Sequence, residues 1–136
     1  MHDETNLSLA SIEAFKSKDP NKQVGCVIVR PNGSIASSGY NRLPKGYDFE
    51  YHTMIVKNEI IEHAEMMAIS LCAENMIGYS LYVYPIPPCS RCAATIINSG
   101  ITRVITHPVE TGSKWEDSCK LAKCMFEKAG VEYIEL

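Results

Sequence analysis

The second half of the chain alternates between short β-favouring runs and longer stretches with helical spacing, and this order most restricts the possible fold. In chain order, the predicted strands and helices cover residues 81–84 (strand), 89–99 (helix), 103–107 (strand), 115–129 (helix) and 131–136 (strand). Gly100 and Gly130 stand where the two helices are expected to end. Strands joined by crossover helices run parallel within one sheet. The alternation therefore predicts a layered α/β fold.

The first half predicts an opening helix over 5–16 and a β-hairpin from strands 24–29 and 34–39, with a turn at Pro31-Asn32-Gly33. Residues 39–46 break both periodicities, and helical spacing resumes near Lys57. One helix is then expected over 59–76. At 136 residues the chain suits one domain, so we expect a single domain over 1–136.

Composition limits the classes of function. The chain is 46% hydrophobic and has no apolar run long enough to span a membrane, which gives no indication of a membrane role. Its N-terminus lacks a basic region followed by an apolar stretch, so we expect a cytoplasmic protein without a secretory signal. The net charge of −3 offers polyanions no general attraction, which makes a nucleic-acid partner unlikely.

The six cysteines are expected to be unpaired, because a cytoplasmic protein meets a reducing environment. Four of them fall in apolar strand or helix patterns, where a free cysteine packs as a small hydrophobic residue. Only Cys89 and Cys92 have the spacing of metal ligands.

Chemistry is indicated by two motifs, His63-Ala64-Glu65 and Pro88-Cys89-Ser90-Arg91-Cys92. One imidazole and two thiolates can hold zinc with a fourth position open for water, as in catalytic sites. Both motifs fall near predicted helix starts, where the helix dipole favours a thiolate. A redox pair would leave the histidine motif unexplained, and no second C-x-x-C is present to complete a four-cysteine zinc site. The combined pattern is a known signature of zinc-dependent base deaminases.

Further segments carry a resemblance that covers most of the chain. The segments are 22–25, 39–46, 63–69 and 89–93, with Ile97, Gly100, Ile101 and the helix that ends at Gly130. In these the chain resembles the deoxycytidylate (dCMP) deaminases, of bacterial or phage type, in the cytidine deaminase-like superfamily. The resemblance implies a three-layer α/β/α fold with a central mixed five-stranded sheet.

The resemblance also implies an activity, the hydrolytic deamination of dCMP to dUMP with release of ammonia, which supplies dUMP for thymidylate synthesis. Zinc on His63, Cys89 and Cys92 would activate a water molecule, and Glu65 would move protons between water and the cytosine ring. We expect one zinc ion per chain, because only His52 lies where a second site would need ligands. Relatives assemble through helix surfaces, which implies a homo-oligomer.

Substrate contacts are expected from the loop and from nearby cations. Asn41 resembles the family's contact to base or sugar, and its amide can both donate and accept hydrogen bonds. An anionic phosphate in an acidic protein requires local positive charge, for which Lys22, Arg42, Lys45 and Arg91 are the candidates. Residues His52 and His107 are not expected to have a role in the site.

One position departs from the family pattern, since Met67 stands where relatives have an asparagine that contacts the sugar. A thioether cannot replace those hydrogen bonds, so the substrate could be another cytosine nucleoside or nucleotide, including a triphosphate or a modified form. A tRNA or single-strand base deaminase is a further alternative, which the acidic charge disfavours. A catalytically silent zinc-binding partner is the non-enzymatic alternative, against which the presence of Glu65 argues.

Overall fold

A mixed five-stranded sheet forms the centre of the computed structural model, which describes residues 2–47 and 54–136. The strands are β1 (Gly25–Val29), β2 (Ile35–Tyr40), β3 (Ser80–Tyr84), β4 (Arg103–Thr106) and β5 (Glu132–Glu135). Their order in the sheet is β2-β1-β3-β4-β5. Strand β1 runs antiparallel to β2 and β3, whereas β3, β4 and β5 are parallel. The predicted mixed sheet with parallel later strands is confirmed.

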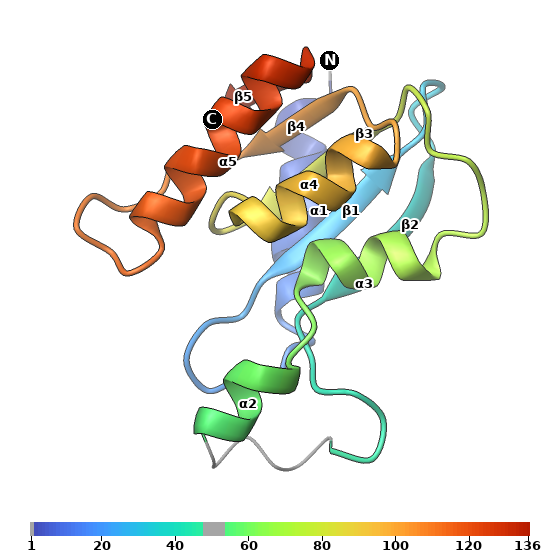
Figure 1. Ribbon diagram of the computed structural model, residues 1–136. Helices are drawn as coiled ribbons and strands as arrows, with labels where there is room; N and C mark the ends of the chain where they lie inside the picture. Colours follow the sequence, from blue (N-terminus) through green and yellow to red (C-terminus); the bar gives the residue numbers. More distant parts are fainter. Residues whose placement is uncertain (1, 48–53) are drawn as a thin grey trace.

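Helices cover both faces of this sheet (Figure 1). They are α1 (Asp3–Ala14), α2 (Met54–Ile60), α3 (Ala64–Leu71), α4 (Ser90–Asn98) and α5 (Glu116–Ala129). Helix α1 packs on one face, while α3, α4 and α5 contribute to the core on the other. Helices α4 and α5 are the crossover connections between the parallel strands.

Two hydrophobic cores result because neighbouring residues of a strand point to opposite faces. In β1, Val27 and Val29 pack in the cluster that includes α1. The alternate residues Cys26 and Ile28 pack in the cluster formed with α3, α4 and α5. All five residues of β1 are buried, as expected for a strand covered on both faces.

The predicted single helix over 59–76 is wrong, because the chain forms two helices, α2 and α3, with residues 61–63 between them. The backbone of Glu62 instead makes an isolated antiparallel bridge with Arg42. The Arg42 amide donates to the Glu62 carbonyl oxygen at 3.1 Å, and the Glu62 amide donates to the Arg42 carbonyl oxygen at 2.9 Å. This long-range pairing interrupts the helix and places His63 at the N-cap of α3.

The other predicted elements are present with small shifts at their ends. The hairpin β1–β2 contains a register irregularity between Ile28 and Val29. Helix α5 ends at Gly130, which has a φ of 78°, as predicted from the sequence. All six cysteines are unpaired, although Cys124 is exposed on α5 and not packed. None of the described helices combines the length and apolar character that a bilayer crossing requires.

Candidate active site

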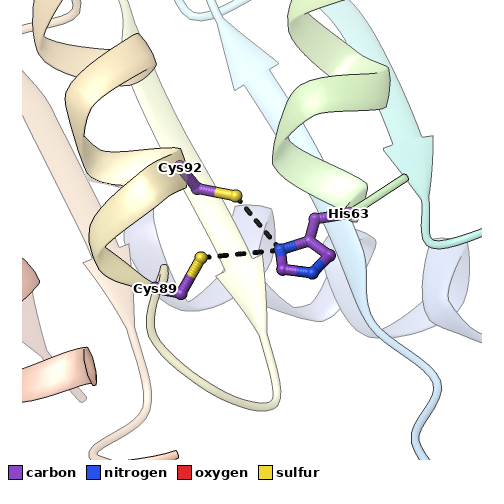
Figure 2. A group of neighbouring side chains, drawn as sticks. All are labelled: His63, Cys89 and Cys92. Carbon is purple, nitrogen blue, oxygen red and sulfur yellow. Dashed lines mark hydrogen bonds between the residues drawn. The ribbon is translucent and has the colours of Figure 1, made fainter. Parts of the chain in front are cut away.

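His63, Cys89 and Cys92 come together where α3 and α4 begin side by side (Figure 2). The Nδ1 atom of His63 lies 3.3 Å from Sγ of Cys92 and 3.6 Å from Sγ of Cys89. All three potential ligand atoms lie within 4.8 Å of one another. Ligand atoms of a tetrahedral zinc ion with N and S donors are about 3.5–3.8 Å apart, from bonds of about 2.0–2.3 Å. The cluster therefore fits a zinc ion with three protein ligands.

The electrostatics of the cluster favour an anionic sulfur. The pKa of the Cys89 thiol is lowered to about 3, first by the hydrogen bond with Cys92 and then by the His63 ring. The Cys92 thiol shares that hydrogen bond and is buried, so its own pKa is raised. The hydrogen bond with Cys89 raises the pKa of His63. Cys89 is therefore the most acidic thiol of the cluster.

Glu65 lies two residues after His63, in the first turn of α3, and only 4% of its surface is exposed. Burial raises its pKa to about 7, and the nearby His63 offsets part of that rise. A carboxyl group that titrates near neutral pH can both accept and donate a proton. Glu65 lines the same pocket as His63 and Cys89.

That pocket is shared by several segments that lie far apart in the sequence. Its lining comprises residues of the loop 19–24, Asn41, the second half of α2, the start of α3, the segment before α4 and the start of α5. Among the predicted site residues, Glu65, His63, Cys89, Asn41 and Lys22 line it. The structure therefore gathers the chemistry and part of the expected substrate contacts into one cavity.

Asn41 is buried, and its side chain fastens the loop 19–24 to the sheet. Its Oδ1 accepts a hydrogen bond from the Val24 amide at 2.9 Å, and its Nδ2 donates to the Lys22 carbonyl oxygen at 2.8 Å. Since these bonds use both ends of the amide, Asn41 shapes the pocket wall. It also lines the pocket, and its Nδ2 lies 3.5 Å from Oδ2 of Asp19 as well. One lone pair of Oδ1 is left to accept a hydrogen bond from a ligand.

Three of the predicted phosphate-binding cations, Arg42, Lys45 and Arg91, lie outside the lining of this pocket within the described residues. The Arg42 guanidinium lies 5.6 Å from the centre of the Tyr40 ring. Both Lys45 and Arg91 are exposed. Of the four predicted cations, Lys22 is the one that the fold brings to the pocket.

The altered position Met67 also lies outside the described pocket lining. It packs against β2, where a Cβ atom added to Gly39 would come within 2.9 Å of the Met67 Cβ. This close approach of α3 to β2 leaves no room for a side chain at position 39. Away from this pocket, Nδ1 of His107 donates to the Leu136 carbonyl oxygen at 2.9 Å. His52 lies outside the described residues.

Among the pocket residues that sequence reasoning missed are three charged side chains and one tryptophan. These are Asp19, Lys57, Lys114 and Trp115. The Lys57 ammonium lies 3.2 Å from Oδ1 of Asp19, and the two side chains are 7% and 3% exposed. A fully buried lysine is rare, and no local pattern marks one in advance. Trp115 did have a signal, because it is a large aromatic residue at the start of the predicted helix 115–129, directly after a turn-like segment.

Comparisons with known proteins agree with this geometry. Residues 1–108 match the family model described as the cytidine and deoxycytidylate deaminase zinc-binding region. Human deoxycytidylate deaminase is 33% identical over 138 residues, covering 93% of this chain and 75% of the human protein. The dCMP deaminase of cyanophage S-TIM5 in apo form has a TM-score of 0.76 at 25% identity, with 98% of this chain and 96% of the phage chain covered. Its complex with dCMP and dUMP gives a TM-score of 0.78 at 23% identity, covering 98% and 95% of the two chains.

Proposed function

The chain belongs to the cytidine and deoxycytidylate deaminase family and is a hydrolytic deaminase with the cytidine deaminase-like fold, and we propose that it converts dCMP to dUMP. The observation that carries the proposal is the buried Glu65 in one pocket with His63 and Cys89, beside Cys92. The 33% identity to human deoxycytidylate deaminase over 93% of this chain supports the choice of dCMP.

We propose zinc as the metal of this site, because one imidazole and two thiolates are the donor set of catalytic zinc. A zinc ion held there would act as a Lewis acid on a water molecule near neutral pH. The three side chains are already close enough to share one ion. Among the residues described by the structure they are the one such cluster found.

Glu65 has the position and acidity for the proton transfers of the reaction. Its carboxylate takes a proton from the attacking water and passes it to ring nitrogen N3 of the cytosine, while the water oxygen adds to C4. It then transfers the second proton to the departing amino group, which leaves as ammonia. The balance is dCMP and water in, dUMP and ammonia out. A pKa of about 7 allows the same group to serve both steps.

The experiment tests a panel of substrates with the zinc-loaded protein. Turnover is detected by the release of ammonia and by the change in absorbance of the base. We expect turnover of dCMP. Cytidylate, deoxycytidine, deoxycytidine triphosphate and a single-stranded oligonucleotide are assayed in parallel as the competing substrates. Failure to deaminate dCMP while another member is deaminated would contradict the proposed substrate. Failure on every member, with zinc bound, would favour the silent zinc-binding partner.

Replacement of Glu65 by Gln separates catalysis from metal binding. The variant should retain its zinc content and lose about 10²–10⁴-fold in kcat, the usual contribution of general acid–base catalysis. Glu59→Gln is the matched control, since Glu59 is exposed on α2 and does not line the pocket. Near-normal turnover by metal-loaded Glu65→Gln would contradict the assigned role.

Three features of the protein as a whole complete the proposal. The catalytic unit is a single domain over 1–136, because both ligand motifs and the pocket draw on segments from residue 19 to residue 119. It acts as a homo-oligomer, for which light scattering on the zinc-loaded protein is the direct test. The dUMP formed supplies thymidylate synthesis. Complementation tests this role, since the protein should restore growth to a strain that lacks its own source of dUMP.

A further inference from the structure

The pocket contains three lysines, Lys22, Lys57 and Lys114, and their charges are not equivalent. The ammonium group of Lys57 is buried against the Asp19 carboxylate at 3.2 Å. Asp19 therefore neutralises Lys57, and this pair contributes little net charge to the pocket.

Lys22 and Lys114 differ from Lys57 in this respect. No ion pair joins either ammonium group to a carboxylate anywhere in residues 2–47 and 54–136. Instead both lie near one aromatic ring, with Nζ of Lys22 5.2 Å and Nζ of Lys114 4.9 Å from the ring centre of Trp115. We call these three residues the tryptophan–lysine cluster.

The cluster brings positive charge together at the substrate pocket in a net acidic protein. The Trp115 ring attracts each ammonium group, which keeps both lysines beside the same pocket although their charges repel each other. Lys22 belongs to the loop before β1, and Trp115 is the N-cap of α5, so the fold joins two distant segments here. An anion at this place would relieve the repulsion and accept hydrogen bonds from both ammonium groups.

We infer that the tryptophan–lysine cluster binds the phosphate group of the nucleotide substrate, an inference that rests on the proposed function. All three cluster residues line the same pocket as Glu65, so a nucleotide can present its base to the carboxylate and its phosphate to the lysines. Lys22 was one of four candidates from the sequence, whereas Lys114 and Trp115 emerge from the fold. The cluster selects a nucleoside monophosphate over a nucleoside.

Intrinsic fluorescence tests this inference directly, because Trp115 is the one tryptophan in the sequence. The zinc-loaded protein is titrated with dUMP, deoxyuridine and inorganic phosphate, none of which requires turnover. In the wild type we expect dUMP to change the tryptophan emission and to bind more tightly than deoxyuridine. The variants are Lys22→Ala, Lys114→Ala and the double variant, with Lys128→Ala as the control for loss of one exposed lysine.

Each single variant should weaken dUMP binding about 5- to 20-fold, the range expected for one partly solvated charge-assisted hydrogen bond. The double variant should bind dUMP no better than deoxyuridine, while deoxyuridine affinity and zinc content stay unchanged. In turnover assays the KM for dCMP should rise while kcat is retained, so that kcat/KM falls.

Three results would overturn the inference. The first is that the double variant binds dUMP as tightly as Lys128→Ala does. The second is that the double variant loses as much affinity for deoxyuridine as for dUMP. The third is that the wild type binds dUMP and deoxyuridine equally well. Lack of dCMP turnover with lysine-dependent dUMP binding would instead reject the proposed reaction and leave the phosphate site supported. The two proposals therefore fail through different measurements.

Discussion

Replacement of Lys57 by Met tests the buried ion pair that lies in the wall of the pocket. Methionine is an unbranched side chain of comparable length, so it fills the space and removes the charge. The Asp19 carboxylate then remains buried without its cation, since the two side chains are only 3% and 7% exposed in the native protein. Breaking a buried pair in this way costs about 3–5 kcal/mol of folding free energy.

The remaining contacts of Asp19 place the expected loss at the lower end of that range. Its Oδ1 still accepts a hydrogen bond from the Asn21 amide at 2.8 Å, which stabilises part of the charge. We therefore expect Lys57→Met to lose about 3 kcal/mol, or about 10 °C in Tm for a domain of this size. Lys128→Met, on the exposed last turn of α5, should change the free energy of unfolding by less than about 0.5 kcal/mol.

The measurement is urea unfolding of the zinc-loaded protein at neutral pH, with the free energy taken from the midpoint and slope. The double variant with Asp19→Asn should be more stable than Lys57→Met alone, because no unpaired charge remains buried. A loss below about 0.5 kcal/mol for Lys57→Met would refute the reasoning, since it would mean that water already solvates the pair.

Three other outcomes are expected. The Ser118 hydroxyl accepts a hydrogen bond from the Ser90 amide at 3.1 Å and so caps α4, whose own N-cap residue Cys89 makes no such bond. Ser118→Ala should therefore lower the free energy of unfolding by about 1 kcal/mol and weaken zinc binding in a chelator competition. Ser118→Thr, which keeps the hydroxyl, should restore the stability and the zinc affinity. Gly25→Ala should yield unfolded or strongly destabilised protein in a far-UV circular dichroism melt, since its Cβ would lie 2.0 Å from the Ala10 carbonyl oxygen. Zinc removal by a chelator should lower Tm and abolish deamination, and zinc addition should restore both; unchanged Tm would contradict metal binding at the cluster.

Local signals were sufficient for most of the fold. Strands of β-favouring residues, the turn at Asn32-Gly33 and the stop at Gly130 each act over a few residues, so their positions follow from the sequence. The break between α2 and α3 does not, because it depends on hydrogen bonds between Glu62 and Arg42, twenty residues apart in the chain. Residues 59–76 keep helical spacing through this break, so periodicity alone gives a helix that is too long.

The meeting of His63, Cys89 and Cys92 could be predicted from the sequence, whereas the candidate phosphate contacts could not. Ligand spacing within each motif limits which side chains can meet one ion, so two short motifs indicate the cluster. Phosphate contacts obey no such spacing, since any cation near the pocket can serve. Arg42, Lys45 and Arg91 are equal candidates in the sequence, and only the fold shows that they lie outside the pocket lining of the described residues.

Lys57 and Lys22 are connected through the loop that contains Asp19, which links stability to substrate recognition. Asp19 Oδ1 accepts from the Lys57 ammonium and from the Asn21 amide, and the next residue after Asn21 is Lys22. Through Lys57, Asp19 therefore attaches the loop that carries Lys22 to α2. Loss of Lys57 should weaken phosphate binding although Lys57 itself is not free to bind it. Since Lys114 is attached to α5 instead, it should retain its share of the affinity, so the Lys57 variant should resemble Lys22→Ala in dUMP binding and not the double variant.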